Sequence, residues 1–178
     1  TATASRSRTR AAGCAGCSGA PAKKAAEKAA EPAGANILHI SWGGIAEADR
    51  DEAKRHWSTW AINLVDGGPA YGWLSPKDIA FPHMLKFELA GNGKVRAVAI
   101  DSRFEPVMRE DGSMSQTAEG SPVRRFALLG STTGPEGPFE TLVEGEAKAD
   151  AQTTVNLPKE SRARWLRLRV GSNWAGSG

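Results

Sequence analysis

The sequence predicts an all-β fold, on three grounds. From Asn36 onward, short segments follow one another in which apolar and polar residues alternate, the pattern of half-buried strands. Clusters of Gly, Pro, Asp and Asn separate these segments, as turns require. Only Glu47–Trp57 has a helical composition, and it is too polar to form more than a surface turn or two. Several short strands at this spacing indicate an antiparallel sandwich or barrel.

The first 35 of the 178 residues differ in composition from the rest. Residues 1–35 are mostly Ala, Ser, Arg, Gly and Lys, and such a segment cannot bury enough apolar surface to offset the entropy lost on ordering. We expect a disordered or partly helical tether that ends near Pro32 and Gly34. Residues 36–178 are expected to form one folded domain.

The net charge of +3 is carried by the tail. Residues 1–35 hold six Lys or Arg and two Glu, whereas residues 36–178 hold 17 basic and 18 acidic residues. The domain therefore lacks the basic bias of a nucleic-acid-binding protein. No apolar run approaches the roughly 20 residues that span a bilayer. We expect neither a nucleic-acid partner nor a transmembrane segment.

The strands are placed by their alternation. Leu85–Leu89 (LKFEL) and Lys94–Ile100 (KVRAVAI) flank the turn-forming sequence AGNG, which predicts a hairpin. Further strands are expected at Arg124–Gly130, Phe139–Val143, Thr153–Leu157 and Arg164–Val170. The stretch GSTTGPEGP between two of them is rich in turn formers.

Four longer segments together resemble a known family. They are WAINLVDGGPAYGWLS (Trp60–Ser75), FPHMLKFELAGNGKVRAVAID (Phe81–Asp101), VRRFALLGSTTGPEGPFETLV (Val123–Val143) and ARWLRLRVGSN (Ala163–Asn173). In this order they are similar to the motifs of discoidin, or coagulation-factor C-type, domains of the galactose-binding-like family. The resemblance implies a jelly-roll β-sandwich whose loops at one end recognise a ligand. Members bind glycans, lipid head groups or proteins, so the fold alone leaves the ligand open.

The first candidate ligand-binding residues are aromatic. Exposed aromatic rings stack on sugars, and this chain gathers several within a short stretch. The Trp73 position is part of the core in relatives, and we expect Trp60 in the core as well. Trp57, beside His56 in a polar stretch, is the best exposed candidate, with Tyr71 nearby in the sequence. Packing in the core or at its rim is the alternative for each.

Arginines form a second candidate set. Arg124 and Arg167, with their neighbours Arg125 and Arg169, present guanidinium groups that bind anionic groups through paired hydrogen bonds. On the last predicted strand, Arg167 and Arg169 share a face with Trp165, opposite the leucines. A solvated outer sheet face is the alternative interpretation.

A structural Ca²⁺ ion is implied by the resemblance at Asn63 and Asp66, since many relatives hold one in this loop. Calcium takes six to eight oxygen ligands, and the Gly-rich turn after Asn63 lets carbonyl groups converge. The alternative is that Asp66 and Gly67 only cap a tight turn. The C-terminal Glu that usually adds a ligand is absent here.

Cys14 and Cys17 lie in the tail, within the small-residue sequences AAGC and CAGCSG. These resemble the box before a lipid-modified cysteine in bacterial lipoproteins, and an Ala/Lys/Glu tether typically follows it. No apolar segment precedes the box, which counts against lipidation. A Cys-x-x-Cys pair is also half of a zinc site. We expect a secreted or bacterial envelope-anchored protein, periplasmic or attached to the outer membrane.

No catalytic set emerges, because the sequence lacks a Gly-x-Ser-x-Gly elbow, a phosphate-binding loop and a His-Glu-x-x-His motif. The first hypothesis is therefore a non-catalytic module that binds a carbohydrate or another envelope component. The second is an assembly protein. The chain stops at SNWAGSG, where relatives have one more strand, and the resulting sheet edge would be free to pair with a protein partner.

Overall fold

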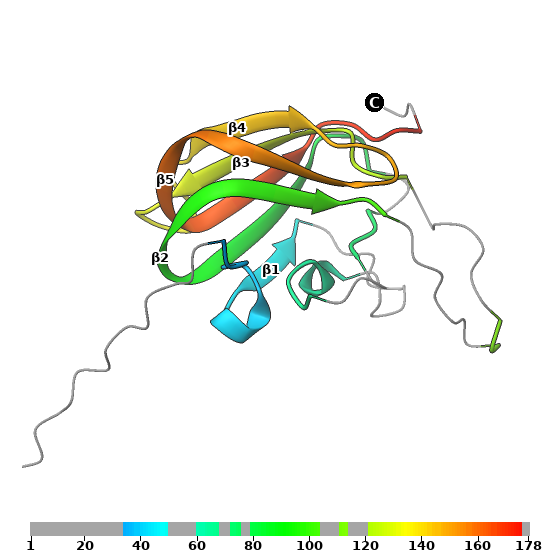
Figure 1. The fold of residues 1–178 in the computed structure, drawn as a ribbon, viewed down its shortest axis with the longest axis horizontal. Coiled ribbons are helices and arrows are strands. Elements are labelled where there is room, and N and C mark those ends of the chain that lie inside the picture. Colours follow the sequence, from blue (N-terminus) through cyan, green and yellow to red (C-terminus); the bar gives the residue numbers. More distant parts are fainter. Residues whose placement is uncertain are drawn as a thin grey trace, which may run out of the picture. The chain divides into compact units, whose positions relative to one another are not determined.

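The computed structural model describes residues 34–49, 60–67, 72–75, 79–103, 111–113 and 121–175. Residues Asn36–Gly178 form one compact unit. Its strands are β1 (Ile45–Ala48), β2 (His83–Asp101), β3 (Arg125–Ser131), β4 (Glu140–Glu146) and β5 (Gln152–Val170), and its short 3₁₀ helices are η1 (Ile40–Trp42) and η3 (Ala61–Leu64). The strands are antiparallel in the order β1-β2-β5-β3-β4 (Figure 1). The predicted all-β fold is confirmed.

β2 and β5 bend the sheet into two layers. Each strand is 19 residues long, and they pair along most of their length, from His83↔Val170 to Asp101↔Gln152. The register shifts between Glu88 and Gly93, where β2 bulges and turns back over itself (Figure 1). Bulges increase local twist and bend the strand that carries them. The later half of β2 and the earlier half of β5 thus form the second layer of a sandwich.

The predicted hairpin at Ala90–Gly93 is wrong. Leu85–Leu89 and Lys94–Ile100 are parts of β2, and both pair with β5 instead of with each other. A tight type I′ hairpin turn needs positive φ at both central residues, and none of Gly91, Asn92 and Gly93 has a positive φ. The two last predicted strands are likewise one continuous strand, β5.

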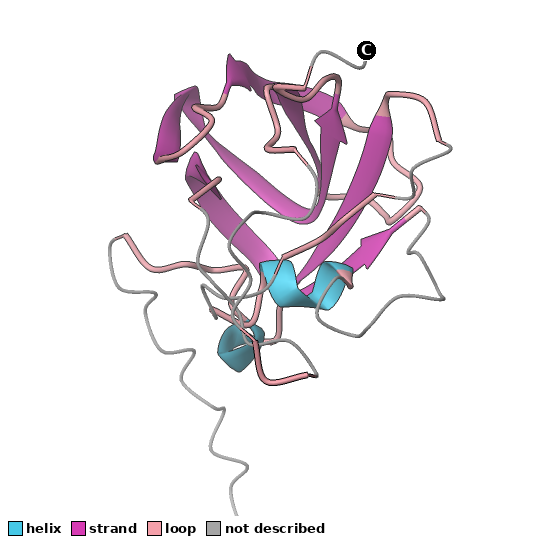
Figure 2. Cartoon of the chain, turned by 90° about the vertical axis from the view of Figure 1, so that its right-hand side faces the viewer, coloured by secondary structure: helices cyan, strands magenta, loops and turns pink. Residues whose placement is uncertain are grey.

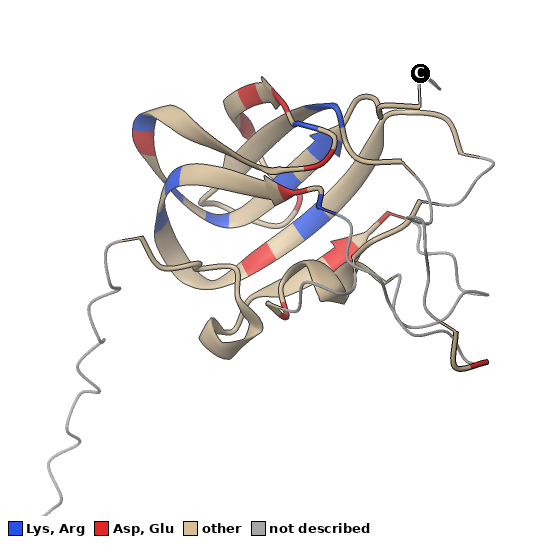
Figure 3. Ribbon diagram, turned by 45° about the vertical axis from the view of Figure 1, so that its right-hand side comes forward, with Lys and Arg blue, Asp and Glu red and all other residues tan. Residues whose placement is uncertain are grey.

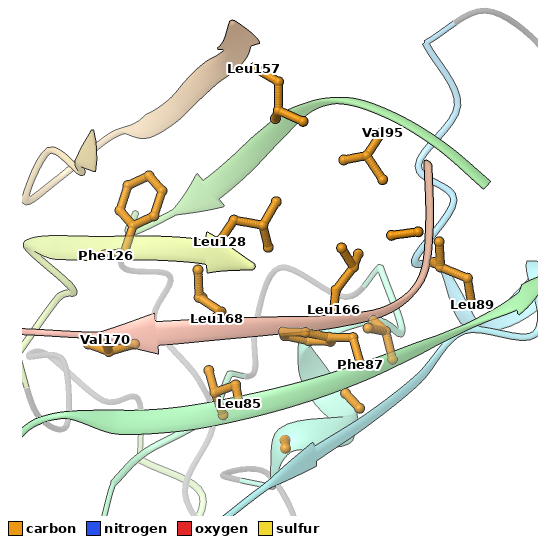
Figure 4. Close-up of a cluster of buried hydrophobic side chains, with 14 of the residues drawn as sticks. Leu85, Phe87, Leu89, Val95, Phe126, Leu128, Leu157, Leu166, Leu168 and Val170 are labelled. Atoms are coloured by element: carbon orange, nitrogen blue, oxygen red, sulfur yellow. The ribbon is translucent and has the colours of Figure 1, made fainter. Parts of the chain in front are cut away.

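The hydrophobic core lies between the two layers. Leu85, Phe87 and Leu89 alternate with polar residues along β2 and are buried, as the period-two pattern predicts. Figure 4 shows Val95 and Leu157 of the second layer pointing toward side chains of the first. Full burial of each such side chain contributes roughly 1.5–3 kcal/mol.

The helical expectation for Glu47–Trp57 is wrong at its start. Glu47 and Ala48 belong to β1, where they pair with Lys86 and Leu85 of β2. Pairing with the sheet outweighs the helical propensity of these residues. Residues 50–57 of that segment lie outside the described residues. In the part of the chain that is described, no helix is long and apolar enough to cross a membrane.

Candidate functional site

One end of the sandwich gathers several chain segments. β2 and β3 begin there and β4 and β5 end there, as the pairs His83↔Val170 and Arg125↔Glu146 show (Figure 1). After β5, the chain passes alongside the segment that enters β3. The backbone N–H of Trp174 donates to the Pro122 carbonyl at 3.1 Å. We call this region the Trp174 end.

Trp174 is fixed in place and still exposed. Its indole Nε1–H donates to the Ala147 carbonyl at 2.9 Å, and the guanidinium carbon of Arg124 lies 4.7 Å from the ring centroid. The residue nevertheless remains 41% exposed. Large aromatic groups normally bury most of their surface, so an immobilised and exposed indole is a candidate contact for a ligand.

Polar groups of both signs surround this indole. Arg124 Nε donates to Glu146 Oε1 at 3.2 Å, and Arg125 Nε lies 4.0 Å from Glu146 Oε2. These side chains are 40% to 72% exposed, so their remaining donors and acceptors face solvent. An apolar ring beside oriented donors and a carboxylate is able to bind a molecule that has both an apolar face and hydroxyl groups.

Arg167 contacts the loop between β3 and β4, at the end of the sandwich opposite to the Trp174 end. Its Nη2 donates to the Pro135 carbonyl at 2.8 Å and to Glu136 Oε2 at 3.1 Å, and its guanidinium carbon lies 4.2 Å from the Phe139 ring centroid. These contacts fasten the loop between β3 and β4 onto the sheet. Arg167 also lies opposite the buried Leu166, as the alternation predicts. Arg124 and Arg167 therefore do not share one site.

The outer face of the sheet is a network of ion pairs. Examples are Lys86 with Asp49 at 3.3 Å and Arg164 with Glu88 at 2.8 Å, and charged residues of both signs lie along the strands (Figure 3). Arg169 Nη2 lies 3.5 Å from Glu144 Oε1. Each of these cations faces a carboxylate, which leaves the sheet face without a concentrated charge of either sign.

The two described tryptophans of the predicted aromatic cluster, Trp60 and Trp73, differ in their burial. Trp73 is half-buried against the core, as expected, and makes an edge-on contact with His83 at a centroid distance of 5.6 Å. Trp60, expected in the core, is 43% exposed, so that expectation is wrong. The reason is local, because η3 inserts Ala61 and Val65 into the core and Trp60 stands before the helix as its N-cap.

Several predicted site residues lie outside the described residues, namely His56, Trp57, Tyr71, Cys14 and Cys17. Asn63 is buried within η3, and Asp66 follows that helix in the chain. The described segments contain no group of three or more His, Cys, Asp or Glu that could hold a metal ion. Calcium at Asn63 and Asp66 thus remains a prediction from the resemblance.

Trp174 was not among the site residues predicted from the sequence. The sequence does contain a feature that indicates its exposure. Trp174 is the only aromatic residue after β5, and it stands among small and polar residues in SNWAGSG, where no strand pattern would bury it. What the sequence does not show is its partner, because Arg124 is 50 positions away and meets Trp174 only through the pairing of β3 with β5.

The fold is shared with solved carbohydrate-binding modules. No family model and no curated protein matches the sequence. Solved structures do match. A family 32 module of NanJ from Clostridium perfringens, solved with galactose, has 17% identity and a TM-score of 0.58, covering 75% of this chain and 85% of that one. A second module from C. perfringens, CpGH89CBM32-5, was solved with GalNAc-β-1,3-galactose, at 15% identity and a TM-score of 0.60, over 75% and 87% of the two chains.

A third similar structure is chitosan-binding module 2 from a Paenibacillus sp. IK-5 chitosanase/glucanase, solved with chitotriose. It has 13% identity and a TM-score of 0.56, over 79% of this chain and 92% of that one. At these identities the likeness establishes the fold. The chain therefore shares the β-sandwich fold of these carbohydrate-binding modules, as its four ordered motifs predict.

Proposed function

We propose that this chain is a non-catalytic carbohydrate-binding module whose site includes the Trp174 end. The observation that carries the proposal is the exposed Trp174 indole, held by the Ala147 carbonyl and flanked by Arg124 and Glu146. Modules with the same fold were solved with galactose, GalNAc-β-1,3-galactose and chitotriose, which supports a carbohydrate as the ligand.

The recognition follows from the chemistry of the sugar. A pyranose ring has an apolar face of C–H groups that stacks on an indole, and its hydroxyl groups project from the rim. Arg124 and Arg125 supply donors and Glu146 supplies an acceptor for these hydroxyls. Because Trp174 is already held by hydrogen bonds, binding costs little side-chain entropy. Stacking and hydrogen bonding of this kind require no acid–base chemistry.

The proposal extends to the residues inferred from the sequence. His56, Trp57 and Tyr71 would supply further contacts, and a structural Ca²⁺ at Asn63 and Asp66 would stabilise the loop after η3. A carbohydrate ligand also fits a secreted or envelope-anchored protein, with lipidation at Cys14 or Cys17 as the route of anchoring. None of these features is needed for the Trp174 contact.

A glycan array followed by isothermal titration calorimetry tests the proposal, with galactose, GalNAc-β-1,3-galactose and chitotriose among the probes. We expect binding to at least one glycan, and a loss of about five- to thirtyfold in Trp174→Ala, since removal of a stacked aromatic group costs about 1–2 kcal/mol. Arg169→Ala is the control, because it removes an exposed arginine from the outer sheet face. Absence of binding to every glycan, or full affinity in a folded Trp174→Ala, would refute the proposal.

A further inference from the structure

A second surface of the domain exposes apolar side chains. Among the described residues, six large hydrophobic side chains are at least 40% exposed, and Trp174 is one of them. The other five lie on or beside η1, β1 and η3, and we call them the η1–η3 surface: Ile40, Trp42, Ile45, Trp60 and Leu64.

The segments that carry this surface adjoin one another. The backbone N–H of Ile40 in η1 donates to the Val65 carbonyl, directly after η3, at 2.7 Å. β1 packs against η3, and both short helices lie on the β1 side of the sandwich (Figures 1 and 2). Ile45 pairs with Glu88 on β2, whereas the Trp174 end lies at His83, where β2 begins. The side chain at the start of β1 is therefore separate from the Trp174 end.

The η1 side of this surface is rigid. The Ser41 N–H donates to His39 Nδ1 at 3.1 Å, which caps η1 at its start, and Gly43 closes it with a φ of 81°. Gly44 packs so closely that a Cβ there would lie 1.9 Å from the Leu38 carbonyl oxygen. The backbone that carries Ile40 and Trp42 is therefore held at both ends of η1, which lowers the entropy cost of ordering it when a ligand binds.

The described residues that carry this surface hold few charges. Residues 34–49 and 60–67 contain Glu47, Asp49 and Asp66 as charged side chains and contain no Lys or Arg, although 24% of the whole chain is charged. The cations on the neighbouring strands, Lys86 and Arg164, are already paired with Asp49 and Glu88, so this region offers little attraction to a polyanion or an anionic lipid surface. The charge pattern favours a neutral ligand.

Its composition favours a sugar ligand. Five side chains that are each 40–50% exposed present on the order of 400 Å² of apolar surface in total. Two of the five are tryptophans, whose rings stack on the apolar faces of sugars. A second copy of the chain would also bury such a surface, and the oligomeric state separates the two occupants.

We propose that the η1–η3 surface is a second carbohydrate-contacting surface, which binds the apolar faces of a neutral polysaccharide through Trp42 and Trp60. This inference depends on the proposed function only in taking a carbohydrate as the class of ligand. Two separate contacts on one domain raise the retention on a polymer more than either contact alone, because the second binding event is intramolecular.

Retention of the full chain on colloidal chitin and on microcrystalline cellulose, both uncharged, tests this inference. We expect the wild type to be retained on at least one of them and Trp42→Ala/Trp60→Ala to lose about fivefold or more of that retention. The same double variant should keep its affinity for soluble glycans at the Trp174 end within about twofold. Trp174→Ala should show the converse pattern, losing soluble-glycan affinity and keeping partial retention on the polymer.

Leu64→Ser provides a milder variant if the double variant does not fold, and it should lower retention as well. The inference is overturned if the wild type is retained on neither polymer, or if the variants are retained like the wild type. It is also overturned if light scattering shows a wild-type dimer that the double variant abolishes, since the surface would then bind a second copy. Retention without any soluble-glycan binding would support this surface while refuting the Trp174 site.

Discussion

The guanidinium carbon of Arg124 lies 4.7 Å from the centroid of the Trp174 ring, and Glu146 accepts a hydrogen bond from Nε of the same guanidinium. Glu146 thus orients the arginine, and the arginine covers part of the indole. The arrangement joins an aromatic platform to a charged donor at one end of the sandwich. Its energetic contribution to folding is small, because both partners of the ion pair are 40% or more exposed.

We therefore expect Arg124→Gln to affect binding more than stability. Removal of the cation and its donors should lower glycan affinity about three- to tenfold, while the free energy of unfolding changes by less than about 1 kcal/mol. Arg124→Lys should restore only part of the affinity, since an ammonium group does not stack as a planar guanidinium does. Calorimetry with the best glycan and thermal denaturation of the same samples provide both measurements. Equal affinities in all three proteins would exclude a role for Arg124.

Arg167 and Arg169 should differ in their effect on stability, although they share one face of β5. The Arg167 side chain is 21% exposed and holds the Pro135 carbonyl, Glu136 and the Phe139 ring, whereas Arg169 is 50% exposed and has one carboxylate at 3.5 Å. We expect Arg167→Gln to cost about 1–3 kcal/mol and Arg169→Gln less than about 1 kcal/mol. Urea unfolding of the two variants makes the comparison. Equal losses would show that the loop between β3 and β4 does not depend on Arg167.

Much of the fold follows from the sequence, for reasons visible in particular strands. The alternation around Phe87 and around Leu168 identified the core face of β2 and β5, because one face of each strand is buried and the other is solvated. The four ordered motifs then identified the sandwich. The bend of β2 was missed, since a Gly-Asn-Gly sequence favours both a tight turn and a bulge, and only the pairing with β5 decides between them.

The site was less predictable from sequence. Arg124 was selected, but its aromatic partner comes from a segment after β5 that has no strand pattern. Trp60 was expected in the core together with Trp73, yet Ala61 and Val65 occupy the core instead. Which aromatic residue of a loop is exposed depends on the tertiary contacts of its neighbours, and a single sequence does not encode these locally.

Gly44 is expected to be irreplaceable at the start of β1. A Cβ at this position would lie 1.9 Å from the Leu38 carbonyl oxygen and 2.6 Å from its carbonyl carbon, so Gly44→Ala forces the backbone around η1 to move. We expect a loss of stability of several kcal/mol or failure to fold. Gly72→Ala is the matched control, because a Cβ there meets nothing within 4 Å. Thermal denaturation should separate the two variants, and equal melting temperatures would contradict this packing.

His83 should make the stability of the domain depend on pH. Its side chain is buried between Phe81 and Trp73, and burial lowers the pKa of its imidazole from the ordinary value of 6.5. Between the lowered pKa and 6.5 the unfolded chain binds a proton that the folded chain does not bind. The free energy of unfolding should therefore be at its full value above pH 6.5 and fall as the pH drops through that window.

His83→Gln separates this effect from the titration of carboxylates. The variant lacks the imidazole, so its unfolding free energy should fall less between pH 7 and pH 5 than that of the wild type, whatever its stability at pH 7. Urea unfolding at several pH values measures both slopes. Asp101, whose pKa is lowered by its hydrogen bond with Arg103, loses its contribution only at more acidic pH, below its ordinary value of 3.8. Parallel slopes in the two proteins would show that the imidazole of His83 takes up its proton equally well in the folded and unfolded chains.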